Sequence, residues 1–276
     1  MNRKLITGVL ALFICGMAYG QSFKDIYEKS IHDNTKVNYP PLREADVIWS
    51  KKIWRIIDLR EKMNQQLYYP TKVMPDGRTN LIGVLLAEIK SGQLNAFDVD
   101  DMNVNVTYAD VETKLGAGAR TEALYNDAGE QIGDTVMMTS AEDEFINIKQ
   151  IMVYEEWYFD KKHSSLAVRI IGLMPIKVSN NEETGRLDRE KLFWVRYDDF
   201  RDSFARHEVF NTGNDAQRIS FDDLFMQRRF ASSIVAESNV FDNRYISDYL
   251  VGKDVIFEAD RIKNELLNFE HDLWEY

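Results

Sequence analysis

The spacing of apolar residues predicts helices in the first third of the chain. Within residues 43–65 they recur at steps of three and four, as on the buried face of a helix. These positions are Ala45, Ile48, Trp49, Ile53, Ile56, Leu59 and Met63. A second helix is predicted over residues 80–91, with Asn80 as its N-cap and Gly92 as its stop.

Further helices are predicted in the last third of the chain. Residues 198–210 and 220–238 are interpreted as helical, and Ser220 with Asp223 forms a capping-box pattern at the start of the second. A last helix runs from residue 254 to the end, with an apolar seam at alternating steps of four and three. The seam consists of Val255, Ala259, Ile262, Leu266, Phe269, Leu273 and Tyr276. Packing of this seam against the chain's own core is favoured, and docking on a neighbouring subunit is the alternative.

Residues 149–177 predict a β-hairpin, because two runs of β-branched and aromatic residues flank a polar turn. If the turn is the five-residue loop 160–164, Glu155 lies directly opposite Arg169 and can pair with it across the strands. Both faces of the hairpin carry apolar residues, so we expect cover on both sides. Residues 191–197 predict another strand.

These patterns predict an α+β fold with a single domain over residues 42–276. Its centre is an antiparallel sheet built on the hairpin, flanked by amphipathic helices. Residues 21–41 are polar with few apolar anchors, and we expect an extended segment there. Weaker signals over residues 94–144 predict short strands and loops.

The first twenty residues have the pattern of a secretory signal peptide. Arg3 and Lys4 precede an apolar run, and Ala18 and Gly20 form a small-x-small cleavage site. The one cysteine, Cys15, lies inside this signal, and bulky residues before it do not fit a lipid-attachment site. The mature chain would then begin at Gln21 without a thiol and outside the cytoplasm.

Charge limits the classes of partner. The formal net charge is −11, and loss of the two basic residues of the signal would take it to −13. An acidic protein repels phosphate backbones and anionic lipid heads, so we expect no nucleic-acid binding and no membrane insertion. A basic protein partner is the simpler electrostatic expectation.

Motifs for catalysis or metal binding do not emerge from the sequence. The four histidines lack metal-ligand spacing, and no nucleophile elbow or phosphate-binding glycine loop is present. Glu155 is the most suggestive carboxylate, because it shares a strand face with apolar residues, but pairing with Arg169 explains it without catalysis. We therefore predict no catalytic, cofactor or metal residues, and no enzyme.

Contact candidates remain on three predicted helices. Trp54 points away from its apolar stripe, and Arg228 and Arg229 lie next to each other on a predicted solvated face. On the last helix the candidates are Leu266, Phe269 and Leu273.

Two blocks of sequence resemble the GldN (PorN) family of gliding-motility and type IX secretion proteins, and the likeness extends over the mature chain. The first block lies within residues 39–70 and the second within residues 220–239. Their most characteristic parts are Tyr39-Pro40-Pro41-Leu42-Arg43, Lys52-Ile53-Trp54-Arg55, Tyr68-Tyr69-Pro70, Phe221-Asp222-Asp223-Leu224-Phe225-Met226-Gln227-Arg228-Arg229-Phe230 and Glu237-Ser238-Asn239.

This resemblance implies a periplasmic, non-enzymatic subunit of a ring beneath the outer membrane. Its implied partners are an outer-membrane lipoprotein of the GldK/PorK kind and the periplasmic part of a GldM/PorM-like protein, which works with GldL. Copies of the chain itself or of the lipoprotein would complete the ring. The alternatives are an exported hydrolase that uses Glu155 with another carboxylate, and a periplasmic chaperone that holds secretion substrates in a groove.

Overall fold

The fold is taken from a computed structural model. It describes residues 31–74, 77–116, 118–125, 131–139, 145–180, 187–211, 213–214 and 216–272. The predicted signal peptide, its Cys15 and the last two seam positions, Leu273 and Tyr276, lie outside these residues. As predicted, helices and antiparallel strands form one α+β unit.

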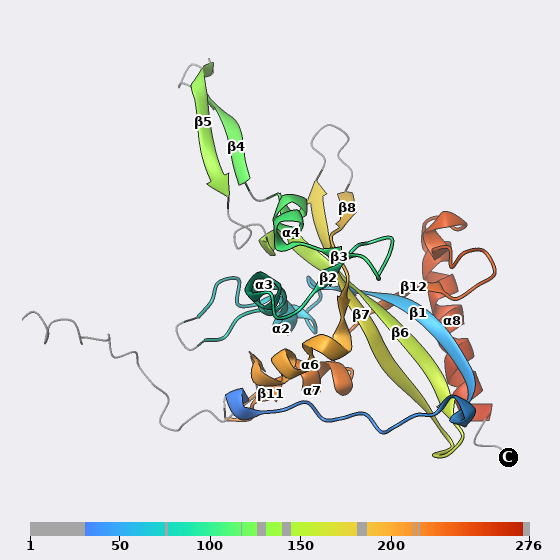
Figure 1. The fold of residues 1–276 in the computed structure, drawn as a ribbon. Coiled ribbons are helices and arrows are strands. Elements are labelled where there is room, and N and C mark those ends of the chain that lie inside the picture. Colours follow the sequence, from blue (N-terminus) through green and yellow to red (C-terminus); the bar gives the residue numbers. More distant parts are fainter. Residues whose placement is uncertain are drawn as a thin grey trace, which may run out of the picture.

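A six-stranded antiparallel sheet forms the centre of the molecule, in the order β12-β1-β6-β7-β8, with β9 also paired to β7 (Figure 1). Its strands are β1 (Val47–Asp58), β6 (Ile148–Asp160), β7 (Ser165–Asn180), β8 (Leu187–Lys191), β9 (Val195–Arg196) and β12 (Ser233–Glu237). The strands β1, β6 and β7 are long and strongly twisted, as Figure 1 shows. The hairpin β6–β7 confirms the central prediction from the sequence.

The predicted helix over residues 43–65 is wrong. A single 3-10 turn, η2 (Glu44–Asp46), leads into β1, and the short helix α2 (Gln65–Tyr68) follows after a turn. In β1 the burial alternates with a period of two residues, and β1 is hydrogen-bonded to β6 on one side and β12 on the other. Its composition, rich in isoleucine and tryptophan, suits a strand better than a helix.

The hairpin register differs by one residue from the prediction. Asp160 pairs with Ser165, so the turn has four residues, and Glu156 instead of Glu155 lies opposite Arg169. Successive side chains of a strand point to opposite faces, so this shift places Glu155 and Arg169 on different sides of the sheet. The predicted Glu155–Arg169 pair is therefore wrong.

Helices and short strands surround the sheet. They are α3 (Leu81–Ser91), α4 (Tyr108–Leu115), α6 (Tyr197–Arg206), α7 (Phe221–Met226) and α8 (Lys253–Asp272), with β2 (Ala96–Phe97), β3 (Asn105–Val106), β10 (Glu208–Val209) and β11 (Ile219–Ser220), and the 3-10 turns η1 (Ile31–Asp33), η3 (Phe145–Asn147) and η4 (Ile246–Asp248). The caps of α3 agree with the prediction: the side chain of Asn80 accepts from the amide of Gly83, and Gly92 ends the helix with a φ of 72°. The capping box of Ser220 and Asp223 is also present, at the start of α7.

The region predicted as a helix over 220–238 divides into two elements. Only α7 is helical, and Arg228 has a φ of 52°, a left-handed conformation that ends the helix. The chain then returns to the sheet as β12, at the edge beside β1. The strand predicted over 191–197 is present only in part: Lys191 ends β8, Val195 and Arg196 form β9, and Tyr197 begins α6.

Buried apolar side chains of the described residues form three clusters, and β1 contributes to all of them. The largest contains Ile57 and joins the sheet to α3, α6 and α7. A second surrounds Met152 and Trp194, with Trp54 packed at its border. The third joins Ile53 and β12 to α8.

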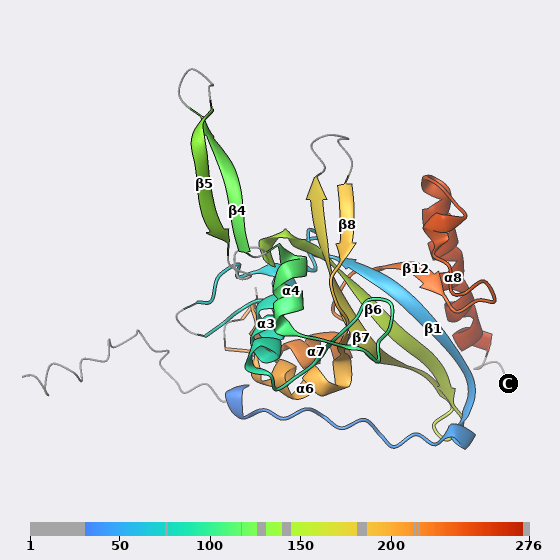
Figure 2. The same cartoon turned by 45° about the horizontal axis from the view of Figure 1, so that its top comes forward.

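The hairpin β4 (Gly118–Tyr125) and β5 (Gln131–Thr139) stands away from the main sheet (Figures 1 and 2). Both views also show the chain from η1 to η2 crossing below α6 and α7 to the turn of β6–β7. Within the described part of the chain, no helix has the length and apolarity that a membrane crossing requires.

The turn after β1 is organised by Asp58. Its carboxylate accepts from the backbone and side chain of Arg60 and from Gln150, and its carbonyl accepts from Asn64 at 2.8 Å. The hydrogen bonds from Arg60 are the main reason that the pKa of Asp58 lies at about 2, below the usual 3.8.

This depressed pKa gives a prediction of pH dependence. The folded state favours the charged form of Asp58. The contribution of Asp58 to the free energy of unfolding is therefore complete above pH 3.8 and is lost as the pH falls towards 2. We expect Asp58→Asn to lower the free energy of unfolding by about 1 kcal/mol at pH 7, after allowance for solvent screening, and by almost nothing at pH 2. Urea unfolding at both pH values measures this, with the exposed neighbour substitution Glu61→Gln as control. An equal loss at both pH values would contradict the prediction.

Candidate interaction surface

Glu155 lies in a closed ionic cluster. Its side chain is fully buried, and the Nη2 atom of Arg228 donates to its two oxygens at 2.9 and 3.2 Å. Trp157 donates its indole N–H to the same carboxylate at 2.9 Å, and Nε of Arg55 lies 3.6 Å away. Burial lowers the pKa of Arg55, which is 8% exposed. Both carboxylate oxygens are occupied and no surface reaches solvent, so this geometry favours a structural role over a hydrolytic one.

Arg228, predicted as a contact residue, therefore acts inside the fold. Its guanidinium also lies over the rings of Trp157 and Phe230, at 5.5 and 5.3 Å from their centroids. It closes the cluster from the loop after α7. Its neighbour Arg229 is exposed and stays a candidate for contact with an acidic partner.

Trp54 lies on the surface of the second apolar cluster. Its ring stacks on Tyr154, with centroids 4.8 Å apart and an interplanar angle of 10°. Part of the side chain stays exposed. The contacts of Trp54 thus fit intramolecular cover, and a role in binding stays a prediction.

Arg169 does not pair with Glu155 but contacts the N-terminal extended segment. Its Nη2 donates to the carbonyl of Pro40 at 2.7 Å, and its guanidinium lies 4.8 Å from the ring centroid of Tyr39. The guanidinium of Arg201 lies 4.1 Å from the same ring centroid. Two arginines from β7 and α6 therefore hold Tyr39 and fix residues 37–40 on the body of the fold.

The seam of α8 packs against its own chain, as favoured from the sequence. Leu266 and Ile262 are buried against Ile53 of β1. Phe269 stacks on Trp49, with the ring centroids 4.5 Å apart. The candidates Leu266 and Phe269 are thus contacts within the molecule, whereas Leu273 lies outside the described residues.

Beside this seam, five apolar residues are strongly exposed, and we call them together the platform. It extends over the loop after β12 and the first turns of α8. Its members expose between 60% and 90% of their surface to solvent. They are Val240, Phe241, Val251, Ile256 and Phe257. Several strongly exposed apolar side chains on two elements that contact each other are a common mark of a protein-binding site.

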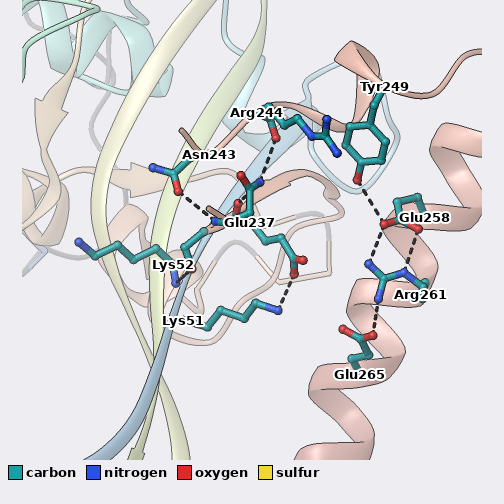
Figure 3. A network of polar contacts seen from close by, with 11 residues as sticks. Lys51, Lys52, Glu237, Asn243, Arg244, Tyr249, Glu258, Arg261 and Glu265 are labelled. Carbon is teal, nitrogen blue, oxygen red and sulfur yellow. Dashed lines mark hydrogen bonds and ion pairs between the residues drawn. The ribbon is translucent and has the colours of Figure 1, made fainter. Parts of the chain in front are cut away.

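A polar network holds the loop of the platform against α8 (Figure 3). The guanidinium of Arg244 lies 4.4 Å from the ring centroids of both Phe241 and Tyr249. Tyr249 donates to Glu258 at 3.2 Å, and Arg261 donates to the same carboxylate at 2.8 and 2.6 Å. Arg261 also binds Glu265 one turn further along the helix.

A second group of contacts ties the start of the loop to β1. Lys51 forms an ion pair with Glu237 at 2.6 Å. The amide of Ser238 donates to the carbonyl of Lys52 at 2.9 Å, and Asn239 binds the carbonyls of Glu237 and Arg244. The loop is thus fixed at its start, in its middle and at α8, so the exposed apolar side chains have a defined arrangement before any partner binds.

Glu258 and Arg261 keep their charges around neutral pH. Hydrogen bonds from Arg261 lower the pKa of Glu258, and the same hydrogen bonds raise the pKa of Arg261. Burial and the same carboxylate raise the pKa of Tyr249, which therefore keeps the proton that it donates. Nothing in the described residues groups three or more potential metal ligands.

Sequence reasoning missed the platform, although its residues were visible. Two features of the sequence could have indicated it. Ile256 and Phe257 are apolar residues of the last helix that lie outside the predicted seam, and Val240, Phe241 and Val251 are apolar residues in a polar loop. Single exposed apolar residues are common in soluble proteins, so only the fold shows that all five are exposed, on a loop and a helix that contact each other.

Comparison with known proteins identifies one family. The family model described as "Gliding motility associated protein GldN" matches residues 42–275. Among curated proteins, none matches the chain.

Proposed function

The chain belongs to the GldN family of gliding-motility-associated proteins, and from this premise we propose that it is a non-enzymatic structural subunit of the type IX secretion and gliding machinery. In this role it lies in the periplasm and forms a ring with an outer-membrane lipoprotein of the GldK/PorK kind. It also contacts the periplasmic part of a GldM/PorM-like protein of the motor module, which includes GldL.

The platform is the observation that carries this proposal. Phe241 is 60% and Phe257 is 68% exposed, and both belong to elements fixed by the Arg244 and Arg261 contacts. Side chains that are already ordered lose little conformational entropy when a partner binds, which favours a stable contact between subunits. The closed environment of Glu155 also favours a structural subunit over a hydrolase.

A double substitution in the platform tests the proposal. We expect Phe241→Asp with Phe257→Asp to leave the chain folded, because both side chains point to solvent, and to abolish capture of the lipoprotein. A loss of two aromatic contacts of about 2 kcal/mol each corresponds to a drop in affinity of roughly 1,000-fold. The measurement is the amount of lipoprotein that copurifies from the native envelope, with secretion and gliding as cellular readouts.

Val104→Asp is the matched control, because Val104 is also exposed, at 52%, but lies in the loop before β3. It should copurify with the lipoprotein as the unmodified chain does. A folded double variant that retains the lipoprotein, secretion and gliding would refute the assignment of the platform.

A further inference from the structure

A second exposed apolar surface lies in a groove of about 570 Å³ at the other end of β1. The groove is bounded by α2, the loop that follows it and the residue after β10. Its apolar lining includes Tyr69, Pro70, Met74 and Phe210. Of these, Tyr69, Met74 and Phe210 expose between 41% and 53% of their surface.

The rim of this groove is basic. Of the described residues that line it, the two charged ones are Lys62 and Arg78. The guanidinium of Arg78 lies 5.4 Å from the ring centroid of Phe210 and its Nε is 3.9 Å from Glu208, so the ring and the charge are held together. Lys72, in the same loop, is also exposed. In a chain with a net charge of −11, this combination of aromatic surface and positive charge suits an acidic segment with aromatic side chains.

The chain itself contains such a segment after α8. The helix is described to Asp272, and Leu273, Trp274, Glu275 and Tyr276 follow. Together with Glu270 and Asp272, these residues offer three carboxylates and two aromatic rings with no basic lysine or arginine between them. Trp274 and Glu275 also fall outside the seam that packs α8 onto its own sheet.

This segment cannot reach the groove of its own molecule. Phe269 is stacked on Trp49 near the start of β1, whereas the groove begins at Lys62, beyond the end of β1 at Asp58. The strand from Trp49 to Asp58 is about 30 Å long at ~3.3 Å per residue. Four extended residues after Asp272 span at most about 14 Å. Figure 1 agrees, because α2 and the end of α8 lie on opposite sides of the molecule.

We infer, on the premise of the proposed function, that residues 270–276 of one copy dock into the groove of a second copy. Trp274 and Tyr276 contact Tyr69, Met74 and Phe210, and the carboxylates of the segment face Lys62 and Arg78. The contact joins two different surfaces, so it is head-to-tail and repeats along a row of subunits. This row supplies the contact between copies, while the platform stays free for the lipoprotein.

Two variants of the full mature chain test the inference by mixing. The groove variant carries Lys62→Glu and Met74→Asp, and the segment variant carries Trp274→Ala and Glu275→Lys. We expect the unmodified protein to form a concentration-dependent series of oligomers in sedimentation velocity, and each variant alone to be a monomer. An equimolar mixture should form dimers and nothing larger, because it contains one intact groove and one intact segment per pair.

Leu267→Asp is the control, since Leu267 is exposed on α8 but lies before the segment. It should oligomerise as the unmodified chain does.

A photoreactive residue at position 274 gives a second measurement and should crosslink to residues 62–78 or 210 of another copy.

Three results would overturn the inference: oligomers in either variant alone, a mixture that stays monomeric, or an unmodified protein that stays monomeric and gives no such crosslink. Lipoprotein capture through the platform is measured on the same samples. If capture is normal while self-association fails, only the inference falls. If capture fails and self-association persists, only the proposed function falls.

Discussion

Replacement of Glu155 by alanine is expected to lower the free energy of unfolding by about 3–5 kcal/mol, one of the two largest effects that we predict. The carboxylate is fully buried and is shared by Arg228, Trp157 and, at 3.6 Å, Arg55. Without it, Arg55 becomes a buried cation with no counterion. Urea unfolding followed by tryptophan fluorescence measures the loss.

The neighbouring substitution Glu156→Ala provides the control. Glu156 is half-buried on the opposite face of β6, where it lies opposite Arg169. We expect a loss of about 1 kcal/mol or less there. In the double variant Glu155→Leu with Arg55→Leu, the combined loss should be smaller than the sum of the single losses, because no charge is left unpaired. A Glu155→Ala variant as stable as Glu156→Ala would contradict the buried cluster.

The second large effect is expected for Asp222→Asn. Asp222 accepts from Nε of Arg201 at 3.0 Å, from Nη2 at 3.2 Å and from the hydroxyl of Tyr197 at 2.9 Å, all within the core. Burial and the charge of Asp222 raise the pKa of Tyr197, so its hydroxyl stays a donor. Loss of the charge leaves Arg201, which is 1% exposed, without its buried counterion and should cost about 3 kcal/mol.

This substitution should also release the N-terminal extended segment. Arg201 donates to the carbonyl of Val37 and lies over the ring of Tyr39, so an unpaired Arg201 that moves withdraws both contacts. We expect faster amide hydrogen exchange in residues 34–41, in addition to the lower stability. Asp198→Asn is the matched control, because Asp198 pairs with the same arginine at 3.7 Å but its side chain is 68% exposed. Equal effects of the two substitutions would contradict the role given to Asp222.

The sequence predicted the elements whose ends carry local signals. The caps of α3 and the capping box of α7 depend on a few adjacent residues, and the structure has them where they were expected. The hairpin β6–β7 was also predicted, because two long apolar runs flank one polar turn. Its register was not, since a turn of four or five residues fits the same sequence and only the neighbouring strands decide between them.

The prediction for β1 failed for a different physical reason. Its apolar residues fit a helical repeat, but the same residues alternate in burial once β6 and β12 pair on both sides. Tertiary hydrogen bonding therefore overrides the local pattern. The error also placed Trp54 on a helix surface, whereas in the fold its ring stacks on Tyr154.

The candidate surface was the least predictable part. Arg228 was visible in the sequence, but its partner Glu155 is 73 residues away and could not be identified by spacing. The platform likewise joins a loop and a helix through Arg244, Tyr249 and Arg261. Such contacts depend on the path of the whole chain.

The sequence of the outer strand β8 affects whether chains at high local concentration aggregate. Among the described strands it ends the sheet and pairs with β7 alone, and its sequence is Leu187-Asp188-Arg189-Glu190-Lys191. Charged side chains of both signs along an open sheet edge discourage backbone pairing with a second edge. Identical chains crowded side by side are thereby less prone to merge their sheets through this edge into an amyloid-like aggregate.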